Sequence, residues 1–257
     1  MLSDQKKIFT KNNIDKLLNE LSKEYKKLGG RNMPVDLIIV GGAAIIENYG
    51  FRDSTKDIDA IIPAISIMNE AINNTEIKLD LPRGWINNDF TKTSSFSQKL
   101  VLYSKFYKCF NQVLNARYIT GEYLIAMKLK SGRYYKNDLS DIIGILKEHE
   151  NNNSPISYED ISKSITDLYG DWSGIKKSNI EFLNNVLKQK NYDDLYKKAR
   201  SKEIDTRNFI LEFQEKYPNA LNNNNIDTII ENQDKNNLYD HFSIRDILIR
   251  LKEANNI

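Results

Sequence analysis

The feature that most constrains this chain is an apolar run that ends in two adjacent glycines. Residues 35–40 lie between Pro34 and Gly41 and are rich in leucine, isoleucine and valine. A short run of this kind predicts a buried strand, and the residues from 43 to 49 predict a short helix after it. Glycines at 41 and 42 would let the backbone approach a phosphate closely, with the unpaired N–H groups of the helix N-terminus facing its oxygens. The sequence therefore predicts a phosphate-binding turn at Gly41 and Gly42.

Two aspartates follow this helix on a second expected strand, residues 57–62, which ends at Pro63. Side chains alternate along a strand, so Asp57 and Asp59 are expected on one face and Ile58 on the other. Two close carboxylates repel each other unless a divalent cation neutralises them, and Mg²⁺, or Mn²⁺ in its place, suits oxygen ligands. An isolated Asp-x-Asp is more often a solvated strand face, but its place after the glycine turn favours a metal site.

Strands and helices alternate in the first part of the chain, and helical patterns dominate the rest. Apolar periodicity predicts a helix over 11–28 and another over 65–73, strands over 99–108 and 112–120, a helix over 121–131, and later helices over 158–168, 179–190, 206–217 and 243–254. The asparagine-rich segment with Ser154 and Pro155 marks a natural boundary. We therefore expect an α+β domain over 1–150 and a helical domain over 151–257.

Composition places the chain among globular proteins, with 40% hydrophobic and 28% charged residues. Its longest apolar run is far shorter than the roughly 20 residues that a membrane-spanning helix needs. The first residues lack the apolar core of a signal peptide. We expect a cytoplasmic protein without a membrane partner. Cys109 is the only cysteine, which excludes an intramolecular disulfide, and its neighbours indicate a small residue of the core.

The glycine turn and the aspartate pair together resemble the signature of the polymerase-beta nucleotidyltransferase superfamily. That signature is a Gly-Gly or Gly-Ser turn followed about a dozen residues later by Asp-hydrophobic-Asp, matched here by Gly41, Gly42, Asp57, Ile58 and Asp59. The resemblance implies a mixed sheet with flanking helices, followed by an all-helical C-terminal domain. It also implies that the enzyme transfers NMP from an NTP to a hydroxyl acceptor with two Mg²⁺ ions, held by Asp57 and Asp59.

More narrowly, the segment from Gly42 to Asp59 is similar to the AbiEii-like and MenT-like nucleotidyltransferases of abortive infection and toxin–antitoxin systems. The residues that carry this resemblance are Ala43, Ala44, Arg52, Ser54 and Thr55, together with residues 126–129, Arg133 and 137–141 further along. It covers residues 35–147.

The branch resemblance implies two sets of site residues. Those that contact the nucleotide are Gly41, Gly42, Arg52, Ser54, Thr55 and Lys128; those that act in catalysis are Asp57, Asp59, Lys128 and Asp141. It further implies an acceptor that is the 3′ end of a tRNA or a protein side chain, and a cognate antitoxin as partner.

Lys128 and Asp141 also have structural interpretations. Lys128 shares a helical face with Leu124 and Ile125, an unusual place for an ammonium group unless it meets an anion, for which a triphosphate is the candidate. The alternative is a lysine whose stem covers an apolar face while its charge reaches water. For Asp138 and Asp141 the alternative is a favourable position at a helix N-terminus.

One part of the superfamily pattern is missing from the expected strands. A third carboxylate usually comes from a later strand, but residues 99–108 and 112–120 contain none, which leaves Asp80 and Asp89 as substitutes. If neither reaches the site, the alternative is a catalytically degenerate nucleotidyltransferase-fold protein that acts as a nucleotide-binding or partner-binding regulator.

Basic residues outnumber acidic ones between residues 76 and 136, and aromatic residues lie among them. A surface of this composition binds RNA when bases stack on exposed rings. The alternative is that the rings fill the core of a sheet while the lysines face solvent. The aromatic residues concerned are Phe90, Phe96, Tyr103, Phe106, Tyr107, Tyr118 and Tyr134.

Overall fold

The computed structural model of the chain describes residues 8–222 and 225–236. The chain divides into two compact units, the first formed by residues 1–133 and 138–197 and the second by residues 134–137 and 198–257. The sheet and most of the helices belong to the first unit. None of the described helices is both long enough and apolar enough to cross a membrane.

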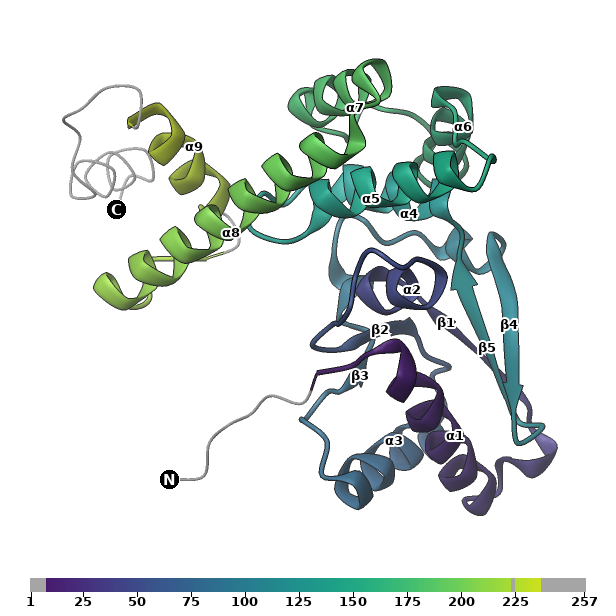
Figure 1. The fold of residues 1–257 in the computed structure, drawn as a ribbon. Coiled ribbons are helices and arrows are strands. Elements are labelled where there is room, and N and C mark those ends of the chain that lie inside the picture. The colour runs from purple at the N-terminus through teal and green to yellow at the C-terminus, as the bar shows by residue number, and fades with distance from the viewer. Residues whose placement is uncertain (1–7, 223–224, 237–257) are drawn as a thin grey trace. The chain divides into compact units, whose positions relative to one another are not determined.

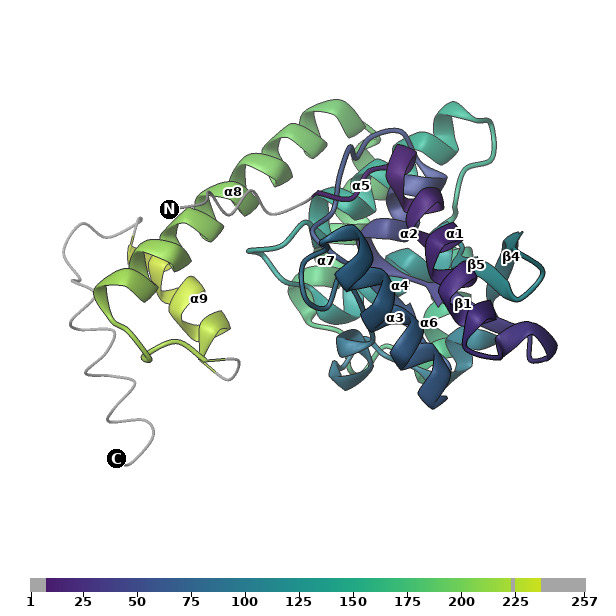
Figure 2. The same ribbon diagram turned by 90° about the horizontal axis from the view of Figure 1, so that it is seen from below.

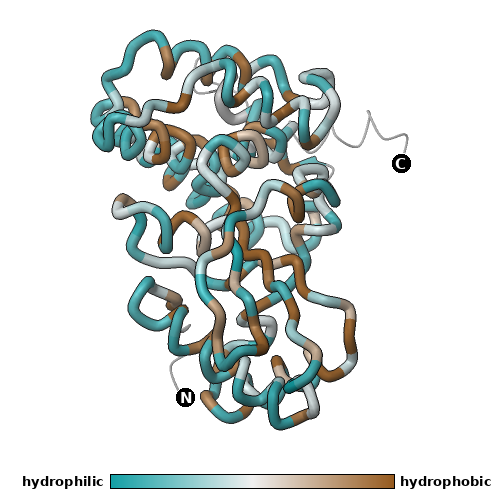
Figure 3. The backbone as a smooth tube through the Cα atoms, turned by 90° about the vertical axis from the view of Figure 1, so that its right-hand side faces the viewer, coloured by the Kyte–Doolittle hydropathy of each residue, from teal (hydrophilic) through white to brown (hydrophobic). Residues whose placement is uncertain are grey.

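A mixed sheet of five strands forms the centre of the first unit (Figure 1). Its strands, in the order β3-β2-β1-β5-β4, are β1 (Val35–Ile39), β2 (Ile58–Ile61), β3 (Ile86–Asn87), β4 (Ser104–Phe110) and β5 (Leu114–Ile119). β1 is parallel to β5 and antiparallel to β2, while β3 runs parallel to β2 and β4 antiparallel to β5. Apolar residues, brown in Figure 3, lie both in the sheet and in the helices of the first unit. The expected α+β fold with a mixed sheet is confirmed.

Three helices accompany the first half of the sheet, α1 (Lys11–Lys27), α2 (Gly41–Asn48) and α3 (Ser66–Leu79). α1 and α3 lie side by side (Figure 2). α1 is amphipathic, because Ile14, Leu18, Leu21 and Tyr25 follow helical spacing and are fully buried. α2 connects β1 to the loop that leads into β2. β1, which precedes the predicted glycine turn, and β2, which carries Asp59, are neighbours in the sheet.

The chain continues into a helical layer after β5, with α4 (Gly121–Ser131), α5 (Asp138–Asn151), α6 (Tyr158–Tyr169) and α7 (Lys177–Gln189). α4 packs against both α5 and α6. Asn179 of α7 is buried and donates from Nδ2 to the carbonyl oxygen of Leu129 at 2.9 Å, which ties α7 to α4. For these reasons the first unit extends well beyond the boundary expected at residue 150.

The second unit contains most of α8 (Tyr192–Lys216) and all of α9 (Ile226–Asn236). Phe213 and Ile229 are fully buried at its centre, and Phe209, Tyr217, Ala220 and Leu221 pack around them. The helix expected over 206–217 is thus the last part of a longer helix, and α9 was not expected. The helix expected over 243–254 lies outside the described residues.

The predicted strand over 99–108 is wrong in its first half. Residues 98–101 form a short 3-10 helix, and β4 begins only at Ser104. Ser97 accepts a hydrogen bond from the Lys99 backbone N–H at 3.3 Å, a local capping contact that favours the helical turn. β4 is an edge strand, and Cys109 on it is exposed rather than part of the core.

Gly144→Ala is expected to destabilise the protein, although alanine normally stabilises a helix interior by about 1 kcal/mol relative to glycine. Gly144 lies within α5, and a Cβ there would overlap the ring of Phe51. Overpacking of this kind costs about 1–3 kcal/mol. Urea unfolding should show the loss, whereas Gly50→Ala, whose added Cβ meets nothing within 4 Å, should change stability little. A gain in stability for Gly144→Ala would contradict the packing of Phe51 on α5.

Candidate active site at the glycine turn

The carboxylate of Asp59 lies against Gly41, in the turn between β1 and α2. It has a φ of +60°, and a Cβ on it would lie 3.0 Å from Oδ2 of Asp59. The backbone N–H of Val40 donates to the carbonyl oxygen of Asp59 at 2.9 Å, which fixes the two segments side by side. Both the positive φ and the close approach of Asp59 favour glycine at this position.

The guanidinium group of Arg52 and the hydroxyl group of Thr55 lie against Gly42, the next residue of the turn. A Cβ on Gly42 would lie 2.8 Å from Nη2 of Arg52 and 2.8 Å from Oγ1 of Thr55. Arg52 also donates from Nε to the carbonyl oxygen of Ser54 at 3.1 Å. The loop that carries these residues therefore folds back over the N-terminus of α2.

The segment before α1 anchors this loop. Phe9 and Thr55 exchange two backbone hydrogen bonds of 2.8 Å, forming an isolated antiparallel bridge. The Phe9 side chain is buried, with its ring centroid 6.4 Å from that of Trp85. Thr55 is thus held through its backbone by a segment that the buried Phe9 ring anchors.

The two aspartates lie at the start of β2. Ile58 and Ala60 are fully buried, whereas Asp59 between them is half-buried and points to the opposite face. Asp57 immediately precedes the strand and is also half-buried. Asp59 is in register with Asn87 of β3, a neighbour that the sequence did not indicate.

Neither substitute for a third carboxylate joins the pair. Asp89 is largely exposed and forms an ion pair with Lys92 at 2.8 Å, and Asp80 ends α3 in a left-handed conformation with a φ of 50°. Within residues 8–222 and 225–236, no group of three or more histidine, cysteine, aspartate or glutamate side chains is arranged to hold a metal ion. Asp57 and Asp59 are the carboxylates that would hold Mg²⁺ here, because this ion is commonly bound by one or two carboxylates together with substrate phosphates.

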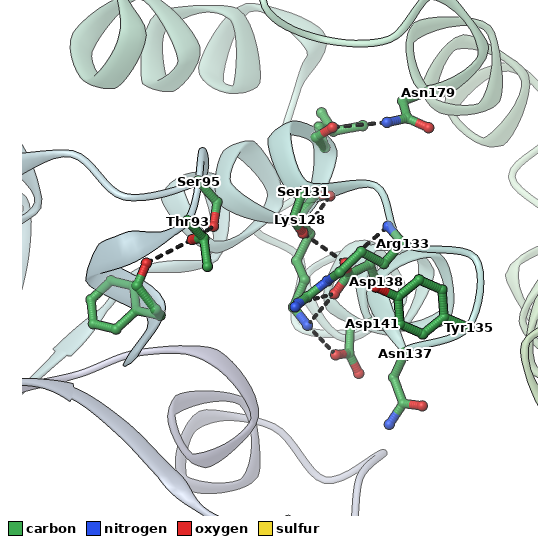
Figure 4. Close-up of polar contacts among 12 residues, drawn as sticks. Thr93, Ser95, Lys128, Ser131, Arg133, Tyr135, Asn137, Asp138, Asp141 and Asn179 are labelled. Carbon is green, nitrogen blue, oxygen red and sulfur yellow. Dashed lines mark hydrogen bonds and ion pairs between the residues drawn. The ribbon is translucent and has the colours of Figure 1, made fainter. Parts of the chain in front are cut away.

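Lys128 of α4 lies between two carboxylates of α5 (Figure 4). Its Nζ is 2.8 Å from Oδ1 of Asp138 and 2.8 Å from Oδ2 of Asp141. The same Oδ2 of Asp141 accepts a hydrogen bond of 2.9 Å from Nη1 of Arg52. Asp141 therefore joins Lys128 to Arg52, the arginine that covers Gly42. Arg52 and Asp141 are 89 residues apart in the sequence.

Most of the site residues predicted from the sequence are connected by contacts, but no contact joins Asp57 to the others among the described residues. Asp59 lies on Gly41, Arg52 and Thr55 lie on Gly42, and Arg52 reaches Lys128 through Asp141. Ser54 joins through its backbone carbonyl group.

Residues 16–206 match the protein family described as "Nucleotidyltransferase of unknown function (DUF6036)". The chain belongs to this family. The match supports the superfamily resemblance and the general class of enzyme, and the matched range contains every residue of the candidate site. No curated protein and no solved structure shows a significant match.

In this nucleotidyltransferase, opposite charges hold the buried groups ionised. Burial lowers the pKa of Lys128, but the carboxylates of Asp138 and Asp141 outweigh burial, and the pKa lies above its usual value. Burial likewise raises the pKa of Asp138, but Lys128 and Arg133 hold it well below its usual range. The ammonium group of Lys128 is therefore charged across the physiological pH range.

Asp138 is the most heavily hydrogen-bonded of these carboxylates, and it is fully buried. Its Oδ2 accepts from Ser131 Oγ at 2.6 Å, and from the backbone N–H and Nε of Arg133 at 3.1 and 2.9 Å. Its Oδ1 accepts from Lys128 and, at 3.3 Å, from Nη2 of Arg133. A favourable place at a helix N-terminus does not explain so many charged donors. The sequence resemblance included Asp138, but nothing in the pattern showed its burial.

Arg52 beside the turn, and Lys128 linked to it through Asp141, each have a donor without an acceptor in the described part of the chain. The ammonium group of Lys128 has three N–H bonds, of which the carboxylates of α5 take two. Arg52 uses Nε and Nη1, while Nη2 lies against Gly42. These donors, with the N-terminus of α2, form an environment suited to an anion.

The aromatic residues proposed for RNA binding divide between core and surface. Phe90 and Tyr118 are buried, as expected for a sheet core, whereas Phe106 and Tyr107 on the edge strand β4 are 58% and 40% exposed. Phe106 and Tyr107 are therefore the aromatic residues with the rings most available for stacking by RNA bases.

Proposed function

We propose that this protein transfers a nucleoside monophosphate from an NTP to a hydroxyl acceptor in a Mg²⁺-dependent reaction. The observation that carries the proposal is the glycine turn itself. A carboxylate that would bind the metal lies against Gly41, and a guanidinium group that would bind a phosphate lies against Gly42, both at one helix N-terminus.

The triphosphate would bind on the cationic side of the turn. Arg52 supplies Nη2, Lys128 supplies its third N–H, and the first turn of α2 supplies backbone N–H groups. Asp141 holds both cations through one oxygen atom, which keeps Arg52 and Lys128 close together despite their like charge. Thr55 adds a hydroxyl group beside Gly42.

Asp57 and Asp59 would hold the metal, Mg²⁺ or Mn²⁺. A bound Mg²⁺ supplies positive charge that stabilises the phosphate oxygens and the leaving pyrophosphate. The residues of the chain orient the triphosphate and neutralise the charge that the metal does not reach.

The reaction is a substitution at the α-phosphorus of the NTP. The acceptor hydroxyl oxygen forms a bond to this phosphorus, the bond from the phosphorus to the bridging oxygen breaks, and pyrophosphate leaves. The hydroxyl proton passes to a carboxylate of the site or to water. Because no covalent enzyme intermediate is needed, positioning and charge account for the contribution of the protein.

The finer assignment follows from the branch resemblance of residues 35–147. On that basis the protein is a cytoplasmic component of a toxin–antitoxin or abortive-infection system. The acceptor is the 3′ end of a tRNA or a protein side chain, and a cognate antitoxin is a partner.

The test is label transfer by the full-length protein with Mg²⁺ and each α-labelled NTP in turn, with total tRNA and cell protein as acceptors. Label should appear in one acceptor class and disappear when EDTA replaces Mg²⁺. A γ-labelled NTP should transfer nothing, because the γ-phosphate leaves with pyrophosphate.

A second candidate function is that of a nucleotide-binding regulator without catalysis, favoured by the lack of a three-ligand metal group among the described residues. Binding of the NTP without transfer to any acceptor would support the regulator. Absence of both binding and transfer would contradict the two candidates alike.

A further inference from the structure

We propose that Asp138 is a positioning residue of the anion site, which keeps the Lys128 ammonium group charged and fixed beside Arg52. This inference rests on the proposed function, because it assigns Lys128 to the triphosphate. Asp138 itself would touch neither substrate nor metal. It would act only through Lys128.

The geometry explains why Lys128 needs a second carboxylate. Asp141 offers Lys128 one oxygen, and that oxygen also accepts from Arg52. An anion shared between two cations cannot compensate fully for burying both of them. Asp138 supplies the missing negative charge through Oδ1, at 2.8 Å from Nζ.

Asp138 is in turn held rigidly by the segment between α4 and α5. Ser131 ends α4, and Arg133 follows it with three donors to the carboxylate. Gly132 between them has a φ of +49° and lies against the side chain of Asn179. The oxygen that faces Lys128 is therefore fixed by its own hydrogen bonds before any ligand binds.

The charged groups around Lys128 determine the expected response to mutation. They are Asp138 and Asp141 on α5, Arg52 on the loop before β2, and Arg133 beyond Asp138. Asp138→Asn removes one negative charge and leaves two arginines near the buried ammonium group. Burial and the arginines both disfavour the charged form, so Lys128 should lose its proton at lower pH than in the wild type.

The experiment follows the Lys128 Cε signal by NMR in protein labelled with ¹³C-lysine, with Lys128→Arg used to assign the signal. In the wild type we expect no titration below the usual lysine value of 10.5. In Asp138→Asn the midpoint should be lower, and affinity for MgATP should weaken by about tenfold per pH unit above that midpoint. The matched control is Asp167→Asn, which removes a half-buried carboxylate that accepts from Lys163 and Tyr123, away from Lys128. It should leave both readouts unchanged.

Asp138→Glu provides the rescue, because it keeps the charge and should return the Lys128 titration toward the wild-type value. A folded Asp138→Asn variant with an unchanged Lys128 titration would overturn the proposal. If that variant does not fold, a wild-type Lys128 that titrates below 10 would overturn it instead, since two carboxylates should raise the midpoint. If the wild type binds no MgATP, the proposed function fails, while the NMR titration still judges the role of Asp138.

Discussion

Asp59→Asn should lower the rate of nucleotidyl transfer by at least about 1,000-fold, equivalent to about 4 kcal/mol of activation free energy. The variant keeps the size and polarity of the side chain that lies 3.0 Å from a Cβ on Gly41, but it loses the charge that the metal requires. The measurement is label transfer at saturating NTP and Mg²⁺. NTP affinity without metal should change little, because the proposed triphosphate contacts are with Arg52 and Lys128.

The matched control for this prediction is Asp53→Asn, an exposed carboxylate on the loop that leads into β2. Both variants remove one negative charge, Asp53→Asn from the loop before β2 and Asp59→Asn from β2 itself, but only Asp59 lies against the turn. The control should retain the wild-type rate. Equal loss in the two variants would indicate a general charge effect and would contradict the assignment of Asp59 to the metal.

Lys128→Met should lower the free energy of unfolding by about 3–5 kcal/mol, the usual cost of removing one partner from a buried ion pair. Asp138 is fully buried and would keep only Ser131 and Arg133 as donors. Urea unfolding at neutral pH measures the loss. The double variant Lys128→Met/Asp138→Leu should recover part of it, because no buried charge would then lack its partner.

The same ion pair should give a defined pH dependence. The pKa of Asp138 is lowered in the folded protein, so its contribution to stability is present above the unfolded-state pKa and is lost as the pH falls. The pKa of Lys128 is raised, so its contribution is present below the unfolded-state pKa and is lost only at strongly alkaline pH. A Lys128→Met variant as stable as the wild type at neutral pH would contradict this account.

The parts of the site that depend on nearby residues could be predicted from the sequence. A strand followed by Gly41 and Gly42, and an alternating segment around Asp59, are local patterns whose geometry hardly depends on the rest of the chain. The helix predicted over 121–131 has the same bounds in the structure. Its end also depends on a nearby residue, Gly132, which terminates it.

The partners of the charged residues could not be predicted, since they depend on packing between distant elements. Lys128 was assigned to an anion, but its anions in the structure are carboxylates of the next helix. Asp138 appears in the sequence as an ordinary acidic residue at a helix N-terminus, and only the packing of α4 on α5 makes it fully buried. The early start predicted for β4 failed because its first residues turn as a 3-10 helix although their apolar pattern resembles a strand.

The ion pair between Arg52 and Asp141 has a consequence for synthesis of the chain, which proceeds from the N-terminus. The turn, Asp57 and Asp59 are made long before α5, yet Arg52 receives its carboxylate only when residue 141 has joined the fold, 89 positions later. Contacts of such long sequence separation form slowly, because a large loop must close first. During much of translation, a growing chain therefore contains the glycine turn and the aspartates but lacks the ion pair that holds Arg52 in place.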